Sequence, residues 1–442
     1  MGNSLKLALI VAMAIIVALI VGTSMQHRQL RGGKAWYGAV GANTADEAGG
    51  NLHYSVNRVA KSLEDVQGRL KKLGNEMPTL PPGQKPTTAN PLLTNKKKKP
   101  APAVPLANLD DSIFVSVASY RDEQCAPTIY DMYQKAANPQ ALFTGVVEQH
   151  DASDQLCMPK EFADCQLSTF CPSDQIQVRR IEPKDARGPT YGRYLGMLMY
   201  RGEKYMFMID SHNRFVTHWD SIMIKMYNTL PTKKGVLSHY PEAWHNPDDK
   251  GQTNAPLDNR PTTTFLCTAK FVEQGYPRLD GFVVHKTNKP RPQPWAAAGF
   301  LFADAKILQE VPFDPHLHFV FDGEEILYSI RMWTHGWDIF SPSENIIYHY
   351  YYRTKAKKFW SLLPHDWTRR RDGAHRRIQW YLAVTKPGSD ERVVPVDTTE
   401  DAVLVDNAKY GLGKERTLDE WKAFAGVDMK NRKIENKFCP RA

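Results

Sequence analysis

Short apolar runs separated by polar turns characterise the chain from about residue 110 onward. Several runs are rich in β-branched or aromatic residues and too short for helices, which is typical of strands buried on both faces of a parallel sheet. The segments between them have helical spacing. This pattern predicts strands at 113–118, 142–149, 176–181 and 206–209, and helices at 126–137, 188–201 and 217–230.

The pattern becomes less regular after Pro241, where loop residues are frequent. Shorter strands are predicted at 265–271, 282–285 and 299–302, followed by a helix at 321–333 and a strand at 346–352. Because strands and helices alternate along most of this region, we expect a doubly wound α/β sheet with right-handed connections. The predicted domain covers residues 110–442, with a C-terminal extension from about 355.

The N-terminal region has a different pattern. Residues 7–22 carry no charge, and as a helix they span about 24 Å, slightly less than a hydrocarbon core of ~30 Å. Residues 23–25 can extend this run, so residues 1–25 are predicted to be a short tail and an uncleaved membrane anchor. A cleaved signal peptide is the alternative. Basic residues after the run favour a cytoplasmic C-terminal side.

A heptad pattern follows the predicted anchor. Apolar residues at alternating spacings of four and three run from Leu52 to Leu73, which predicts a coiled coil at 52–73 within a stalk at 26–75. This stalk is expected to form a homodimer, and an amphipathic helix lying on a domain is the alternative. Residues 76–109 combine prolines with the Lys96–Lys99 run and are predicted to be an extended linker.

The net charge of +9 and the six cysteines narrow the function only slightly. No zinc-finger spacing or RNP motif is present, so nucleic acid is not an expected partner. The arginines between Arg369 and Arg377 are interpreted as a solvated helical face, with an acidic acceptor or lipid as the alternative. The cysteines are compatible with disulfides whose pairing is left open, and without a CxxC pair no zinc site is expected.

Polar side chains follow two of the predicted strands. Asp210 and His212 come directly after 206–209, at the sheet edge where α/β proteins bind ligands. A carboxylate and an imidazole are suitable ligands for Mn²⁺ or a similar divalent ion, although a solvated Asp beside a loop His is the alternative. Ser119, Tyr120 and Arg121 follow 113–118, where a nucleotide often binds. The absence of GxGxxG and Walker A motifs excludes the common NAD and P-loop folds.

Three longer stretches are more specific: VSVASYRDE (115–123), ARGPTYGRYLGMLMYRGEKYMFMIDSHNRF (186–215) and YGLGKERTLDEW (410–421). Together they resemble the family of polypeptide α-N-acetylglucosaminyltransferases, whose members include enzymes that modify hydroxyproline or threonine. The resemblance covers about 112–428 and implies a GT-A glycosyltransferase fold. The chain is also distantly similar to mucin-type GalNAc-transferases, which share a DSH motif and a later GGEN motif.

The resemblance implies a role for individual residues. Asp210 and His212 would bind Mn²⁺ or Mg²⁺ together with His349, which on chemistry alone reads as a sheet histidine. The FDGEE stretch resembles GGEN, so Glu324 would contact the donor sugar, with Glu325 and Asp322 as neighbours. These acids also suit a helix N-terminus. Arg193 would face the nucleotide rather than solvent, and Gly299 would lie beneath the sugar.

The implied activity is transfer of GlcNAc from UDP-GlcNAc to Ser/Thr or hydroxyproline of a protein acceptor. The family is thought to retain the anomeric configuration, so no single base is assigned. UDP-Glc or UDP-Gal as donor, or a non-catalytic module that binds carbohydrate or a partner, are the alternatives. An anchor, stalk and head suggest a single-pass type II Golgi enzyme, against the orientation that the flanking charges favour.

Overall fold

The computed structural model describes residues 111–440 except 163–169, 246–255 and 355. The chain divides into two units, 1–101 and 102–442, so the described residues belong to the second. The predicted anchor, stalk and linker lie outside the described residues. Within the ranges that are described, no helix is both long and apolar enough to span a bilayer.

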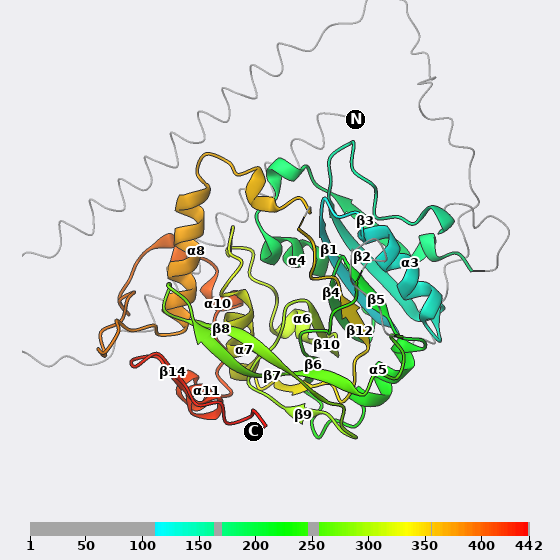
Figure 1. Cartoon of the computed structure of the whole chain (residues 1–442). Coiled ribbons are helices and arrows are strands. Elements are labelled where there is room, and N and C mark those ends of the chain that lie inside the picture. Colours follow the sequence, from blue (N-terminus) through cyan, green and yellow to red (C-terminus); the bar gives the residue numbers. More distant parts are fainter. Residues whose placement is uncertain (1–110, 163–169, 246–255, 355, 441–442) are drawn as a thin grey trace, which may run out of the picture. The chain divides into compact units, whose positions relative to one another are not determined.

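An eight-stranded mixed sheet forms the centre of this unit, in the order β3-β2-β1-β4-β10-β6-β11-β9 (Figure 1). Its strands are β1 (Ile113–Tyr120), β2 (Leu142–Gln149), β3 (Ile176–Arg180), β4 (Tyr205–Asp210), β6 (Gly235–Ser238), β9 (Arg291–Pro292), β10 (Phe300–Asp304) and β11 (Asp338–Ser341). The first four strands are parallel, as predicted, but β10 runs antiparallel to both β4 and β6. The prediction of a fully doubly wound sheet was therefore wrong at β10, which enters from a loop rather than from a crossover helix.

Side chains of the central strands alternate between two hydrophobic cores. On β4, Tyr205, Phe207 and Ile209 join one core, whereas Met206 and Met208 join the other. The first core is covered by α3 (Cys125–Lys135) and α5 (Trp219–Tyr227), and the second by α4 (Pro189–Met197), α6 (Ile307–Glu310) and α7 (Glu324–Thr334). Burial on both faces explains why these strands read as continuous apolar runs.

Three two-stranded sheets lie outside the main one, and one of them, β13 (Val427–Asp428) with β14 (Lys433–Ile434), belongs to the C-terminal extension. β5 (Asn213–Phe215) pairs with β12 (Ile347–His349), and β7 (Thr262–Phe271) forms a hairpin with β8 (Pro277–His285). The strand predicted at 346–352 therefore ends at His349. Its remaining aromatic residues lie in an irregular segment because they have no strand partner.

The C-terminal extension packs through a third core against α7 and the β7–β8 hairpin. The extension contains α8 (Trp367–Tyr381), α9 (Asp401–Leu404), α10 (Asn407–Tyr410), α11 (Leu418–Ala425), β13 (Val427–Asp428) and β14 (Lys433–Ile434). Short 3₁₀ helices occur in it at Phe359–Ser361 and, earlier in the chain, at Pro139–Ala141, Lys160–Phe162, Pro172–Gln175 and Pro183–Asp185. A capping box of Thr417 and Glu420 begins α11.

Arg377 corrects the interpretation of the basic cluster as solvated. Its side chain is fully buried, donates to Asp314 at 2.7 Å and also donates to the carbonyl groups of Val403 and Val405. Arg369 is 83% exposed and does fit a solvated face. Arg377 therefore stabilises the contact between α8 and its neighbours, since a buried charge needs such partners.

Two disulfides join distant parts of the described chain, Cys125–Cys157 and Cys267–Cys439. The first links the start of α3 to the loop after β2. The second attaches the C-terminal segment to β7. No described cysteine is free, which agrees with an oxidised protein.

Candidate active site

A cavity of about 510 Å³ opens beyond the carboxyl ends of β1 and β4. Its walls come from these strands, from α4, from the start of α7 and from the segment after β12. The lining is rich in basic and aromatic side chains, among them Arg193, Arg278, Arg353, Lys357, Lys358, Tyr240, Phe321 and Trp360. A cavity with cationic walls at this edge of an α/β sheet is suited to a phosphorylated ligand.

Asp210 is the last residue of β4 and lies on the same face of the sheet as Met206 and Met208, the side that α4 covers. It accepts a hydrogen bond from Arg193 Nη2 at 3.0 Å, and its Oδ2 lies 3.1 Å from His349 Nε2. Burial alone would raise the pKa of Asp210, but the hydrogen bond from His349 and the charge of Arg193 hold that pKa well below its usual value. Asp210 is therefore a carboxylate.

His212 is buried and its ring is oriented by Asp122. The Nδ1–H of His212 donates to Asp122 Oδ2 at 2.8 Å, while Arg353 Nη1 donates to Nε2 at 3.0 Å. Burial lowers the pKa of His212 to about 4, so the imidazole is neutral at physiological pH. Its Nε2 lone pair therefore points toward the cavity, as required of a metal ligand.

His349 reaches the site through the small β5–β12 sheet. The register of this sheet pairs His349 with Asn213, and the amide of Tyr350 donates to the carbonyl of His212 at 3.0 Å. The two imidazole rings consequently lie edge to face, with centroids 4.4 Å apart. Pairing of strands that are more than a hundred residues apart thus brings the second histidine to the first.

Three donor atoms from Asp210, His212 and His349 all lie within 4.8 Å of one another. The Nδ1 atom of His349 is buried without a hydrogen-bond partner, so this ring is not committed elsewhere. One carboxylate and two imidazoles suit a borderline divalent cation. The residues therefore fit the predicted metal site, provided that the guanidinium of Arg353 moves away from His212 Nε2.

Arg193 connects the carboxylate of β4 with that of α7. It donates to Glu324 Oε2 at 2.6 Å as well as to Asp210, and all but a tenth of its side chain is buried. The second oxygen of Glu324, Oε1, is buried without a hydrogen-bond partner at the cavity. A buried acceptor of this kind requires a donor, which a ligand hydroxyl or amide can provide.

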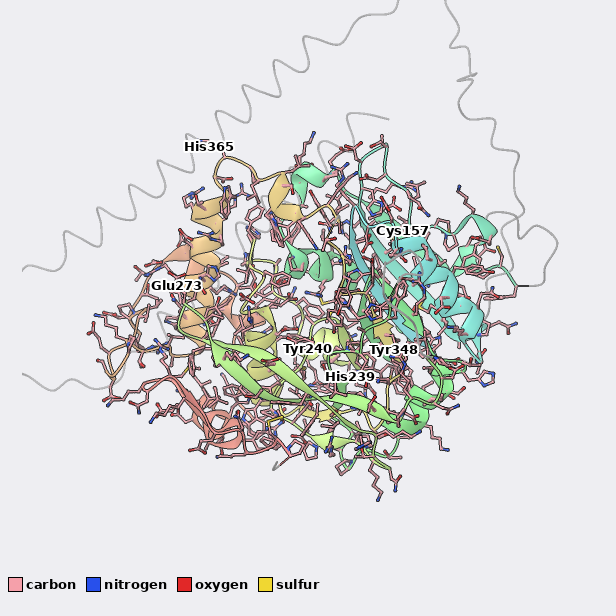
Figure 2. All side chains as sticks on the ribbon, in the orientation of Figure 1. Cys157, His239, Tyr240, Glu273, Tyr348 and His365 are labelled. Atoms are coloured by element: carbon pink, nitrogen blue, oxygen red, sulfur yellow. A yellow bond between two sulfur atoms is a disulfide. The ribbon has the colours of Figure 1, made fainter. Side chains whose placement is uncertain are left out.

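Glu325 faces a different set of groups. Its Oε1 accepts from the amide of Ala298 at 2.8 Å, and its Oε2 accepts from the hydroxyl of Tyr240. Tyr240 follows β6 and lies among the packed side chains at the centre of the unit, next to His239 (Figure 2). Burial raises the pKa of Glu325 to about 7. Glu325 therefore holds the backbone that leads into β10.

Gly299 lies directly beside Asp210. A Cβ atom at this position would lie 2.8 Å from Asp210 Oδ2, which is closer than such contacts occur. Asp322 lies at the cavity margin, where its carboxylate is 3.9 Å from Arg278 Nη1. Both residues line the cavity, but only Gly299 lies against Asp210.

The three residues predicted at the end of the first strand, Ser119, Tyr120 and Arg121, lie in different surroundings. Tyr120 lines the cavity and has a buried hydroxyl without a partner. Ser119 is buried beside His150, at 2.9 Å, and Arg121 pairs with Asp154 at 2.6 Å. Neither Ser119 nor Arg121 is among the cavity-lining residues. The structure therefore places only Tyr120 where the sequence predicted a nucleotide contact.

Sequence reasoning missed Asp122, Tyr240 and Arg353. Asp122 belongs to the same SYRD stretch as Tyr120. Because it follows β1 and His212 follows the neighbouring strand β4, their contact could have been predicted from the two strand ends. Tyr240 and Arg353 carried no recognisable signal, because their contacts with Glu325 and His212 depend on segments that are distant in sequence.

A family model described as Glycosyltransferase (GlcNAc) matches residues 112–172 and 159–431. The chain belongs to this family. The match confirms the family predicted from the three motifs and makes the chain a member of a glycosyltransferase family with a parallel-rich α/β sheet. No curated protein matches the chain.

Several solved structures resemble this glycosyltransferase family member. GalNAc-T7 with UDP, GalNAc and Mn²⁺ has a TM-score of 0.44 and 12% identity over 71% of this chain and 56% of that one. TarS 1–349 of S. aureus in complex with UDP-GlcNAc has a TM-score of 0.38 and 12% identity, over 60% of this chain and 65% of that one. The chain thus spans less than two thirds of either protein, and similarity this low says nothing about its substrates.

Proposed function

We propose that the protein is a metal-dependent GT-A glycosyltransferase that transfers GlcNAc from UDP-GlcNAc to Ser/Thr or hydroxyproline of a protein. The observation that carries this proposal is the convergence of Asp210, His212 and His349 within 4.8 Å inside the cationic cavity. Membership of the GlcNAc glycosyltransferase family supports GlcNAc as the transferred sugar. Attachment through residues 1–25 in the Golgi, with the domain in the lumen, belongs to the same proposal.

A bound Mn²⁺ or Mg²⁺ would act as a Lewis acid that neutralises charge on the diphosphate leaving group. The side chains of Asp210, His212 and His349 would hold it. Arg353 and Lys358 at the same wall would add positive charge where the leaving group becomes more negative.

The donor sugar would lie between α7 and the start of β10. Glu324 is kept in place by Arg193, so its partnerless oxygen can accept a hydrogen bond from a sugar hydroxyl. Gly299 leaves room for the sugar next to Asp210. These groups orient the donor and exclude water, which are the main contributions a protein makes to such a transfer.

No side chain is assigned as a general base for the acceptor hydroxyl. In a retaining transfer the departing diphosphate can take that proton itself. The chain would then contribute electrostatic stabilisation and orientation, so loss of the metal ligands should cost more activity than loss of any single acid.

The test is to incubate the purified full chain with UDP-GlcNAc, Mn²⁺ and peptides containing Ser, Thr or hydroxyproline. We expect UDP release and a glycosylated peptide, both reduced roughly 10²–10³-fold in Asp210→Asn. UDP-Glc and UDP-Gal tested in parallel would identify another donor. Absence of turnover with all three donors, including hydrolysis, would contradict the transferase function and favour a binding module.

A further inference from the structure

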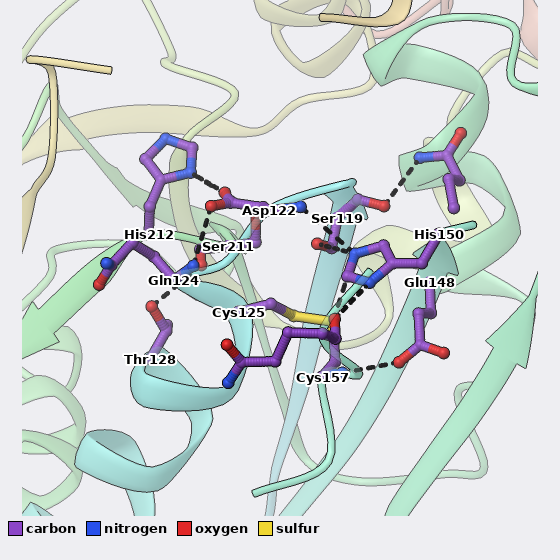
Figure 3. The surroundings of a disulfide bond; sticks show 12 residues. Ser119, Asp122, Gln124, Cys125, Thr128, Glu148, His150, Cys157, Ser211 and His212 are labelled. Carbon is purple, nitrogen blue, oxygen red and sulfur yellow. Dashed lines mark hydrogen bonds and ion pairs between the residues drawn. A yellow bond between two sulfur atoms is a disulfide. The ribbon is translucent and has the colours of Figure 1, made fainter. Parts of the chain in front are cut away.

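A second cluster of potential metal ligands lies on the far side of Asp122 from His212 (Figure 3). It consists of Glu148, His150 and Cys157, whose donor atoms all lie within 4.8 Å of one another. Cys157 is bonded to Cys125, which brings a second sulfur into the same cluster. Both cysteines and Glu148 are almost completely buried.

The histidine of this cluster has its Nδ1 hydrogen-bonded as in a metal ligand. His150 Nδ1 donates to the carbonyl of Gln155 at 2.7 Å, so its Nε2 carries the lone pair. That Nε2 atom lies 3.9 Å from Cys157 Sγ, and it accepts from Ser119 Oγ at 2.9 Å and from the amide of Asp122 at 3.4 Å, so a bound metal ion would replace both donors. A donated Nδ1–H to a backbone carbonyl is the usual way in which a protein fixes a metal-binding imidazole.

The carboxylate of Glu148 is held by two hydrogen bonds. Glu148 Oε2 accepts from the amide of Cys157 at 2.7 Å, and its Oε1 accepts from Arg180 at 2.8 Å. A donor oxygen of this carboxylate lies within 4.8 Å of the Cys157 sulfur. Arg180 also offsets part of the negative charge that two thiolates and a carboxylate would bring together.

We propose that Cys125, Cys157, His150 and Glu148 form a Zn²⁺ site that becomes available when the Cys125–Cys157 disulfide is reduced. Two thiolates, one imidazole and one carboxylate are four ligands of the types that zinc binds tetrahedrally. The two cysteines are 32 residues apart, so no short sequence motif marks the site. The site is separate from the proposed transferase centre and does not depend on its activity.

The chemistry needs only a dithiol reductant and Zn²⁺. The dithiol gives two electrons to the Cys125–Cys157 bond, which breaks to two thiols while the reductant closes to its own disulfide. Zn²⁺ then binds both sulfurs as thiolates, and their two protons pass to solvent. The oxidised chain would carry the disulfide, and the reduced chain would carry zinc at the same place.

The test compares the oxidised full chain with the chain reduced by a phosphine, using Co²⁺ as a spectroscopic substitute for Zn²⁺. We expect thiolate-to-cobalt charge-transfer and tetrahedral ligand-field bands only after reduction, and about one additional equivalent of bound Zn²⁺ per reduced chain. Cys157→Ser and His150→Ala should weaken or remove these bands. Cys171→Ser and the Cys267→Ser/Cys439→Ser double variant are matched controls that should keep them.

A second measurement tests whether the reduced chain stays folded and whether Zn²⁺ stabilises it. Zn²⁺ should raise the melting temperature of the reduced wild type and protect Cys125 and Cys157 from alkylation, as mapped by mass spectrometry. Reduced protein without cobalt–thiolate bands, or bands unchanged in Cys157→Ser, would overturn the proposal. A reduced chain that unfolds and is not restored by Zn²⁺ would overturn it equally.

Discussion

Asp122 orients one of the proposed metal ligands, His212, and is not itself one of them. Its Oδ2 accepts from His212 Nδ1 and from Ser211 Oγ, and it also pairs with Arg353. Burial would raise the pKa of Asp122, but the hydrogen bond from His212 and these neighbours lower it well below its usual value. The residue therefore fixes both the orientation and the tautomer of the imidazole.

We predict that Asp122→Asn lowers Mn²⁺ affinity about 10- to 100-fold, because loss of such an orienting carboxylate typically has this effect. Calorimetric titration of Mn²⁺ measures it directly, without reference to turnover. Asp419→Asn, an exposed acid on α11, is the control and should bind Mn²⁺ like the wild type. Unchanged affinity in Asp122→Asn would remove the assigned role.

Glu325 gives a prediction on pH. Since burial raises its pKa from 4.5 to about 7, the folded protein binds a proton that the unfolded chain releases between these values. The stabilisation is complete below about pH 4.5 and is lost as the pH rises through 7, with an upper size of roughly 3 kcal/mol.

The matching variant is Glu325→Gln, which keeps the side chain neutral at every pH. We expect the difference in unfolding free energy between wild type and variant to change between pH 5 and pH 7.5, with the wild type losing more stability. Denaturant unfolding at both pH values measures this. Glu273→Gln, at an exposed turn (Figure 2), is the control and should show no such change. Parallel pH dependence of wild type and Glu325→Gln would contradict the assignment.

At the scale of elements, α4 positions Arg193 by packing very closely on β1. A Cβ atom at Gly196 would lie 2.4 Å from Ser116 Oγ, and one at Gly192 would lie 3.2 Å from the Cβ of Ala118. Arg193 follows Gly192 directly, so its distance from Asp210 depends on this contact. The glycines thus serve the site through the helix that carries the arginine.

Gly196→Ala should therefore move α4 away from the sheet, lowering stability by about 1–3 kcal/mol and reducing transferase activity. Ser116→Gly in the same chain removes the clashing hydroxyl and should restore much of both. Thermal unfolding and UDP release measure the two effects. A Gly196→Ala variant that is as stable and active as the wild type would show that α4 tolerates the displacement.

Some of the strands could be predicted from the sequence pattern alone, and others could not. The apolar runs at 113–118 and 206–209 identify β1 and β4, because strands buried on both faces need apolar side chains throughout. The reversed direction of β10 could not be read from 299–302, since four apolar residues contain no information on strand direction. The resemblance placed His349 among the candidate metal ligands, and its pairing with β5 explains why it lies beside His212.

For the whole molecule, the predicted coiled coil at 52–73 lies outside the described residues and stays a prediction. If its heptad pattern forms a stalk, the full chain should sediment as a dimer in detergent, and deletion of 52–73 should leave a monomer with the same activity per chain. Analytical ultracentrifugation of both proteins makes this comparison. A full chain that is monomeric at high concentration would contradict the stalk.

The reversed direction of β10 has a consequence for how such a site can change. Because this strand begins where β4 ends, the residues just before Phe300 reach the cavity from a loop, while the strand itself continues into the sheet. Substitutions at Ala298 can reshape the floor of the cavity without altering a single strand pairing. If the cavity binds a donor sugar as proposed, its sugar preference can therefore diverge at this entry point while Asp210, His212 and His349 stay fixed.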